Sequence, residues 1–347
     1  MSKRTLKLGN DIFSKKLLNY VMVSPHYNTC KQWGENINIA DNKTYYYAFL
    51  KAGCFLSRFL KLNTEESIIN KVKDFKKTYL SIKEKGYLKE MELPYMERII
   101  DGNMHYYGGI CCKITVSGDF ELWDGMHRIS VCVALNLPIS ITIVEEHEHW
   151  QKTKEGLLKL HNGQKYLYQY IDHPDFHDWI SFKDNIVKDF LLSELVYGNV
   201  LDIGVCHGLS LYRLKMANKI QRGTGIEYDT NRYNIAKIIY DKIGLRLFDN
   251  IEGFLKDNIE HFNATLMLSV IHHIVRESGV IKAKEILYNI SQISNRIIYE
   301  YPKANESIIT DFGLQGFDFD KFMLEATGFR ETHRFHLDRD IVVFDKN

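Results

Sequence analysis

The second half of the chain alternates short apolar runs with stretches in which apolar residues recur every three or four positions. The apolar runs predict buried strands at 200–203, 223–229, 245–250, 263–274 and 295–302. Helical spacing follows the first two of them, at 211–220 and 231–244. Strands that alternate with helices are typical of an α/β fold with a doubly wound, Rossmann-like sheet. Two last runs, 328–335 and 340–345, predict an antiparallel pair at the edge of that sheet.

The first half has a different pattern, which predicts a smaller α+β domain. Helical spacing is found at 45–60, interpreted as a core helix, and at 71–86, interpreted as an amphipathic helix with a basic face. A strand at 120–124, a helix at 126–135 and an alternating strand at 139–144 follow. The polar stretch 145–165 separates the two patterns. We therefore expect two domains, 1–160 and 161–347.

Charge and composition exclude several classes of protein. The net charge is only +1, so no overall field favours DNA or anionic lipid. Residues 1–160 carry 23 Lys and Arg against 18 Asp and Glu, a balance of +5, whereas residues 161–347 carry 22 against 26, a balance of −4. The six cysteines form no CxxC pair and no zinc spacing, so no metal site is expected. With no apolar leader and no apolar run of 18 residues, we expect a cytoplasmic protein without a membrane span.

The stretch NVLDIGVCHGLS, residues 199–210, joins the first strand to a helix through a glycine turn. The dinucleotide fingerprint GxGxxG would need a glycine where Cys206 stands, and no GKS or GKT follows as in a P-loop. With these two motifs excluded, the candidate ligand-binding residues of the turn are Asp202, Gly204 and Gly208. An acid beside the turn repels phosphate but suits a cationic nucleoside without phosphate. S-adenosylmethionine, a sulfonium joined to an amino acid and adenosine, is such a ligand.

Other polar residues at strand ends fit the same ligand. Glu227 ends the second strand, 25 residues after Asp202, where an acid can accept both ribose hydroxyls. Asp249 and Asn250 end the third strand and could meet the adenine edge. The further cofactor contacts predicted from position are Cys206, Tyr228 and Ser269.

Residues 165–347 resemble the class I S-adenosylmethionine-dependent methyltransferases. LDIGVCHG matches the first motif of that family, GIEYD the second and LSVIHHI the fourth. The lead-in YLYQYIDHPDFHDW, residues 166–179, resembles the segment before the first motif in methyltransferases that modify glycans and nucleotide-sugars. One departure is Asn263, which stands at the start of the fourth strand where Asp is frequent. The resemblance implies a methyltransferase with S-adenosyl-L-methionine as cofactor; another nucleotide-binding domain and a catalytically inactive methyltransferase fold are the alternatives.

The acceptor side is expected at the carboxyl ends of the fourth and fifth strands. His272 and His273 lie at the carboxyl end of the fourth strand, four and five residues past its middle, and an imidazole titrates near the pH at which a general base works. A structural role for either histidine stays open, as does an ion-paired role for Glu300, which ends the fifth strand. The acidic domain lacks a basic stripe, and no Asn-Pro-Pro-Tyr-like motif follows the fourth strand, so nucleic acid is disfavoured. We expect O-methylation of a sugar hydroxyl in a glycan or nucleotide-sugar, with another small metabolite or RNA as alternatives.

The motif WDGMHR, residues 123–128, carries the chemistry of the first half. Asp124 and Gly125 form a turn, and His127 and Arg128 lie at the start of a helix, where free amides and a guanidinium favour a phosphate. The simpler alternative is that Asp124 caps the helix and the basic pair lies on the surface. The motif resembles the DGxHR box of ParB/sulfiredoxin-like domains, with Met126 where sulfiredoxins have cysteine, which implies phosphate or nucleotide binding. We expect it to hold an anionic part of the acceptor; a separate phosphotransfer or hydrolytic activity, or a purely binding role, stays open.

Overall fold

The computed structural model describes residues 4–52, 64–87, 96–100, 103–107, 109–181, 186–258, 260–303 and 305–347. The chain divides into two compact units. Unit 1 holds residues 1–154 and 172–178, and unit 2 holds residues 155–171 and 179–347. In the part of the chain that the structure describes, no helix is both long and apolar enough to cross a membrane.

Unit 1 is built on a four-stranded mixed sheet in the order β1-β6-β4-β5. β1 pairs antiparallel with β6, β6 parallel with β4, and β4 antiparallel with β5. The strands of this sheet are β1 (Arg4–Leu8), β4 (Cys111–Ile114), β5 (Phe120–Asp124) and β6 (Ile139–Glu146). Two further strands of unit 1, β2 (Met96–Ile100) and β3 (Asn103–Tyr107), form a separate antiparallel pair. The helices are α1 (Ile12–Met22), α2 (Pro25–Glu35), the 3-10 turn η1 (Asp41–Lys43), α3 (Tyr45–Lys51), α5 (Glu65–Lys85) and α6 (Met126–Ala134).

In unit 1, α6 packs against α1, α2 and α5, and the core that these helices enclose is rich in aromatic side chains. The aromatic side chains buried there include Phe13, Trp33, Tyr46, Phe75 and Tyr79. The predicted amphipathic helix exists as α5 and begins at Glu65, earlier than its pattern indicated. The predicted helix at 45–60 is described only as α3, and its remainder lies outside the described residues.

Unit 2 is a seven-stranded sheet in the order β11-β10-β9-β12-β13-β15-β14. Its first five strands run parallel to one another, and β15 runs antiparallel to both β13 and β14. The strands are β9 (Gly198–Ile203), β10 (Ile220–Ile226), β11 (Arg246–Phe248), β12 (Ala264–Leu268), β13 (Arg296–Glu300), β14 (Arg330–Phe335) and β15 (Ile341–Asp345). The predicted parallel sheet and its antiparallel edge are therefore confirmed.

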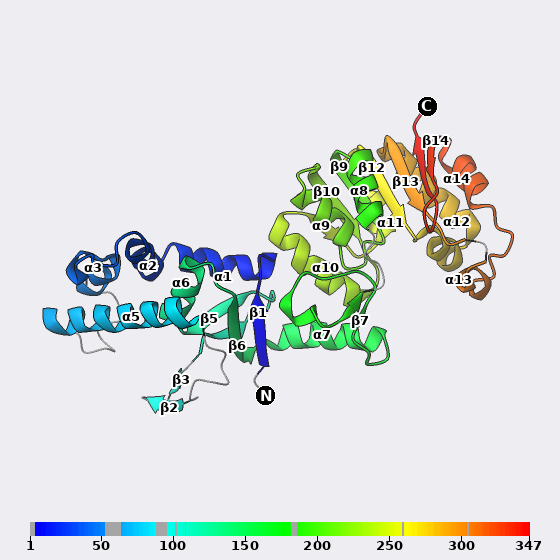
Figure 1. The fold of residues 1–347 in the computed structure, drawn as a ribbon. Coiled ribbons are helices and arrows are strands. Elements are labelled where there is room, and N and C mark those ends of the chain that lie inside the picture. Colours follow the sequence, from blue (N-terminus) through cyan, green and yellow to red (C-terminus); the bar gives the residue numbers. More distant parts are fainter. Residues whose placement is uncertain are drawn as a thin grey trace. The chain divides into compact units, whose positions relative to one another are not determined.

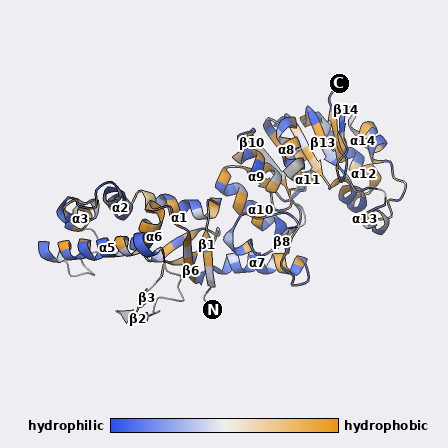
Figure 2. Ribbon diagram, in the orientation of Figure 1, coloured by the Kyte–Doolittle hydropathy of each residue, from blue (hydrophilic) through white to orange (hydrophobic). Residues whose placement is uncertain are grey.

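Helices cover both faces of this sheet (Figure 1). α8 (Ile186–Leu195), α9 (Leu209–Met216) and α10 (Thr230–Ile243) pack as one group. α11 (Ile251–Asp257), α12 (Ile271–Ile293) and α14 (Phe319–Thr327) form the other, and α13 (Ser307–Asp311) lies before α14. The central strands are apolar, whereas the helices carry both polar and apolar residues (Figure 2), as expected of strands buried on both sides.

The connection between the units is structured rather than a bare linker. The stretch 145–165 holds the end of β6 and the helix α7 (Glu148–Leu160), and the division between the units falls inside that helix. A small parallel pair, β7 (Tyr166–Leu167) with β8 (Ile180–Ser181), flanks the 3-10 turn η3 (Pro174–Phe176). Within unit 1, Trp150 Nε1 donates to Asp175 Oδ2 at 2.8 Å, which ties residues 172–178 back to that unit.

Candidate functional site

The glycine loop after β9 has a left-handed backbone at three positions. Gly204, Cys206 and Gly208 have φ values of 76°, 56° and 85°. A Cβ on Gly208 would lie 2.5 Å from the Tyr240 ring, and one on Gly204 would lie 2.7 Å from Val270. Both glycines are therefore needed by the packing of the loop itself as well as by its backbone conformation. Cys206 is not a glycine, and residues other than glycine rarely adopt a positive φ, so its backbone conformation indicates local strain.

Glu227 fastens this loop to the neighbouring strand. It is the first residue after β10 and is only 2% exposed. One carboxylate oxygen accepts from the Cys206 amide at 2.7 Å, and the other accepts from the Asp229 amide at 3.0 Å. Since each carboxylate oxygen can accept more than one hydrogen bond, the group still has capacity for two hydroxyls of a ligand.

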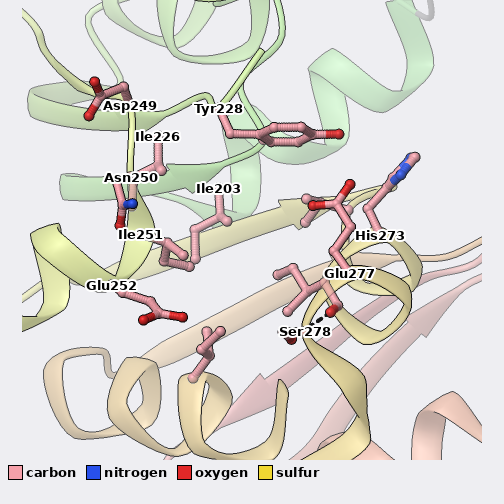
Figure 3. A pocket seen from close by; sticks show the side chains of 14 residues that line it. Ile203, Ile226, Tyr228, Asp249, Asn250, Ile251, Glu252, His273, Glu277 and Ser278 are labelled. Atoms are coloured by element: carbon pink, nitrogen blue, oxygen red, sulfur yellow. Dashed lines mark hydrogen bonds between the residues drawn. The ribbon is translucent and has the colours of Figure 1, made fainter. Parts of the chain in front are cut away.

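A hollow opens at the carboxyl ends of β9, β10 and β11 and at the start of α12 (Figure 3). Consecutive strands are added to one side of β9 as far as β11 and to its other side from β12 onward. The hollow lies at this switch point in the strand order, which is where open α/β sheets bind ligands. Of the predicted site residues, the structure brings Gly204, Tyr228, Asp249, Asn250 and His273 together in its wall. The remaining lining residues are Ile203, Ile226, Ile251, Glu252, Val270, Ile274, Glu277, Ser278 and Ile286.

The wall of this hollow is apolar at its floor and acidic at its rim. Asp249, Glu252 and Glu277 contribute carboxylates, and none of the described residues that line it is a lysine or an arginine. The Tyr228 ring extends over the hollow toward His273 and Glu277 (Figure 3). Such a surface disfavours phosphate and favours a ligand with an apolar planar part and a positive charge.

Asp202 lies behind the loop rather than in the wall of the hollow. It is 3% exposed, and this burial raises the pKa of its carboxyl to about 7, with Lys188 opposing and Glu227 adding to the shift. At neutral pH the group is thus poised between its two protonation states. A positive charge placed nearby favours the carboxylate form.

Gln169 is a site residue that the sequence analysis did not single out. Its Oε1 accepts from the backbone amides of His207 and Leu209 at 3.1 and 3.2 Å, and its backbone oxygen lies 2.9 Å from His207 Nδ1. The lead-in segment therefore packs directly on the glycine loop. The resemblance of residues 166–179 was the signal that this segment belongs to the site, but it did not single out Gln169.

The two adjacent histidines have different surroundings. The strand β12 ends at Leu268, so both lie in the first turn of α12 rather than on the strand as expected. His273 lines the hollow, and burial lowers the pKa of its imidazole, with Glu277 opposing. His272 is 1% exposed and packs against His273 and Phe312. Only His273 is placed to meet a molecule in the hollow.

Ser269 and Glu300 belong to a polar cluster at the ends of β12 and β13. The Ser269 hydroxyl donates to Glu300, and Lys188 forms an ion pair with the same carboxylate. Arg339 Nη1 donates to Ser269 Oγ at 2.8 Å and also pairs with Glu306. Ser269 has a φ of 60°, so a second strained residue lies at this edge of the sheet. The ion-paired role considered for Glu300 is therefore confirmed.

In unit 1, the WDGMHR motif forms the turn and helix that the pattern predicts. Gly125 has a φ of 98° and is the N-cap of α6, and the Asp124 carboxylate accepts from its amide at 2.6 Å. Arg128 Nη1 reaches the Gly109 carbonyl at 3.5 Å. His127 is turned into the aromatic core.

The imidazole of His127 is held as a neutral ring. Its Nε2 lies 2.8 Å from Tyr46 Oη, and its ring packs on Phe75 at 4.5 Å. Burial, and then the charges of His26, Lys71 and Arg128, lower its pKa to about 3. At neutral pH, positive charge at this motif therefore comes from Arg128 and not from His127.

No family model and no curated protein matches this sequence. Among solved structures, the chain is similar to WbdD, a bifunctional kinase-methyltransferase, with a TM-score of 0.45 and 20% identity over 55% of this chain and 46% of that one. It is also similar to a protein of Nostoc punctiforme that has been assigned as an O-methyltransferase, with a TM-score of 0.38 and 15% identity over 46% of this chain and 55% of that one. A third similar structure is TrmK of M. capricolum in complex with S-adenosyl-homocysteine, with a TM-score of 0.33 and 16% identity over 46% and 68%. The alignment thus spans about half the length of WbdD.

Proposed function

We propose that unit 2 is a methyltransferase that uses S-adenosyl-L-methionine. The observation that carries the proposal is the hollow at the switch point of the sheet, with its apolar floor and its acidic rim. A dinucleotide or a nucleoside triphosphate would bring phosphates to three carboxylates. A sulfonium nucleoside brings a positive charge, which the same carboxylates attract.

The residues present fit each part of this cofactor. Asp249 and Asn250 can hydrogen-bond the adenine edge, and the floor of Ile226 and Ile251 suits an apolar ring. Glu227 has hydrogen-bonding capacity for the ribose hydroxyls. Asp202, behind Gly204, supplies a carboxyl for the amino group. The bound cofactor would supply an activated methyl group; this chain supplies its position and the exclusion of water.

We assign the general base to His273. Its lowered pKa keeps the ring neutral at pH 7, so it can take a proton from an acceptor hydroxyl. Glu277, one helical turn further on, can stabilise the ring once it carries that proton. His272, packed behind it, acts as a support.

The proposed acceptor is a sugar hydroxyl of a glycan or nucleotide-sugar. Its support is the lead-in segment, whose Gln169 packs on the loop, and the polar cluster of Ser269, Glu300 and Arg339, which can exchange hydrogen bonds with hydroxyl groups. Transfer of labelled methyl from S-adenosylmethionine to a panel of nucleotide-sugars, cell glycans, small metabolites and RNA tests this proposal. Label in sugars alone supports it, and label in RNA alone rejects it. Absence of label from every acceptor, together with absence of cofactor binding, rejects the methyltransferase.

For unit 1 we retain anion binding at the WDGMHR motif, a ParB-like feature, as a proposal. Its support is the guanidinium of Arg128 beside the first turn of α6. Arg128→Gln should raise the KM for an anionic acceptor about ten- to hundredfold and leave cofactor affinity unchanged. ATP turnover that Arg128→Gln abolishes would instead assign a separate phosphotransfer activity to this motif.

A further inference from the structure

Arg232 is a partly buried cation for which the described residues supply no ion-pair partner. It lies in the first turn of α10. Its Nε is shielded from solvent and meets no hydrogen-bond acceptor among those residues. None of their carboxylates is within the 4.0 Å of an ion pair to its guanidinium, although the charges of Glu227 and Asp229 act to raise its pKa. The guanidinium Cζ lies 5.7 Å from the centroid of the Tyr168 ring. A partly buried guanidinium that forms no direct ion pair can bind a further anion through its free donors, and we infer that an anion of a ligand belongs there.

The two nearest acids are occupied by backbone amides. Glu227 accepts from the amides of Cys206 and Asp229. Asp229 is the N-cap of α10, and its Oδ1 accepts from the amides of Asn231 and Arg232 at 3.0 and 2.9 Å. These hydrogen bonds orient both carboxylates toward the backbone. The guanidinium of Arg232 therefore keeps its fork of donors available to another oxyanion.

The guanidinium lies within electrostatic reach of the hollow. The positive charge of Arg232 acts to lower the pKa values of both Tyr228 and His273, and these two side chains line the hollow. It also acts on the Cys206 thiol in the glycine loop. Among the described residues of the hollow itself there is no lysine or arginine. Arg232 and Arg276 both act on His273, but of these two only Arg232 also acts on Cys206 in the glycine loop.

We propose that Arg232 binds the carboxylate of the amino-acid part of the cofactor, an inference that rests on the proposed function. S-adenosylmethionine carries a single carboxylate, which the acidic rim of the hollow would repel. A guanidinium offers that carboxylate two parallel hydrogen bonds, which an ammonium cannot reproduce. Arg232 thereby selects nucleosides that carry a complete amino acid over those that lack the carboxylate.

Binding calorimetry with two ligands tests this role. S-adenosylmethionine and decarboxylated S-adenosylmethionine share the sulfonium, the amine and the adenosine and differ in the carboxylate. The wild-type chain should bind the complete cofactor about ten- to hundredfold more tightly, as a charge-assisted bidentate contact predicts. Arg232→Gln should bind both ligands with equal affinity, and Arg232→Lys should keep part of the preference.

Lys237→Gln is the matched control, because it removes one positive charge from an exposed position of the same helix. It should keep the full preference for the carboxylate. The proposal is overturned if Arg232→Gln weakens both ligands by the same factor, or if it keeps the wild-type preference while the KM for an anionic acceptor rises. Thermal unfolding followed by circular dichroism checks that each variant is folded. Failure of the wild-type chain to bind either ligand would instead overturn the proposed function and this inference with it.

Discussion

The carboxylate of Glu227 and the backbone amide of Cys206 are joined by a hydrogen bond of 2.7 Å, which fastens the glycine loop after β9 to the end of β10. These residues are 21 positions apart in the sequence and follow two neighbouring parallel strands, β9 and β10. The acid proposed to hold the ribose therefore also fixes the conformation of the loop. Cofactor binding and loop order should consequently change together.

Gly208→Ala should destabilise unit 2 more than Gly244→Ala does. Both glycines have positive φ values, 85° and 69°, so both substitutions carry a backbone cost of about 1–2 kcal/mol. Only at Gly208 would the new Cβ meet a ring, that of Tyr240 at 2.5 Å, whereas nothing lies within 4 Å at Gly244. Overpacking adds roughly 1–3 kcal/mol. Urea unfolding of the two variants measures the difference, and equal losses would show that the loop can relax around Tyr240.

Cofactor affinity should rise with pH up to about 7 and then level. Burial raises the pKa of Asp202 to about 7, and a positively charged ligand favours its carboxylate form, so binding releases a proton below that pH. The dissociation constant of S-adenosylmethionine should fall by about fivefold between pH 6 and 7, and by about twofold more above pH 7. Calorimetry in buffers of different ionisation enthalpy measures the released proton. Asp202→Asn should remove the slope and Asp249→Asn should keep it; a slope that survives in Asp202→Asn contradicts this assignment.

The two adjacent histidines should separate catalysis from stability. His273→Gln should lower kcat about 10²- to 10⁴-fold with little change in cofactor affinity, as expected on loss of a general base. His272→Gln should instead lower the melting temperature, because it puts a polar amide where a fully packed ring contacts Phe312. Turnover with the acceptor found in the labelling panel, and thermal unfolding of both variants, give the comparison. Full turnover in His273→Gln would remove the proposed base.

Unit 1 should lose stability in acid through His26. This side chain is 6% exposed, and burial lowers its pKa from 6.5 to about 4. The unfolded chain therefore takes up a proton before the folded chain does, and stability present above pH 6.5 is lost as the pH falls toward 4. The loss should be about 3 kcal/mol. His26→Phe should reduce the dependence of the urea midpoint on pH in this window without abolishing it, because the neighbouring His127, whose pKa is lowered to about 3, also takes up a proton on unfolding. The exposed His149→Phe should leave the dependence unchanged, and equal slopes in both variants would rule out His26 as a cause.

The apolar runs predicted the sheet of unit 2 well because its central strands are buried on both faces and read as continuous apolar stretches. The sequence could not predict the role of a residue where that role depends on which other residues it contacts in the folded chain. His272 and His273 are neighbours in the chain, and only the helix that begins at Ile271 assigns one to the hollow and the other to the core. A pattern that treats 263–274 as one strand cannot make that distinction.

Long-range contacts explain the other differences. Residues 172–178 return to unit 1 through the bond between Trp150 and Asp175, and a local pattern cannot predict it. Arg232 looks like an ordinary charged residue of a helix in the sequence. Its significance follows from two acids, Glu227 and Asp229, whose oxygens are occupied elsewhere, and this depends on hydrogen bonds that only the folded chain makes.

Titration of S-adenosylmethionine into the full chain by calorimetry tests the central claim most directly. The wild-type chain should bind one molecule, and Glu227→Ala should weaken binding about ten- to hundredfold, because it removes an acceptor for the ribose and the anchor of the Cys206 amide. Gly204→Val should have a similar effect, since its side chain would collide with Val270. Glu194→Gln, at an exposed ion pair, should bind as the wild type does. Absence of binding to the wild-type chain, or the same affinity in all four proteins, would contradict the proposal that this hollow holds the cofactor.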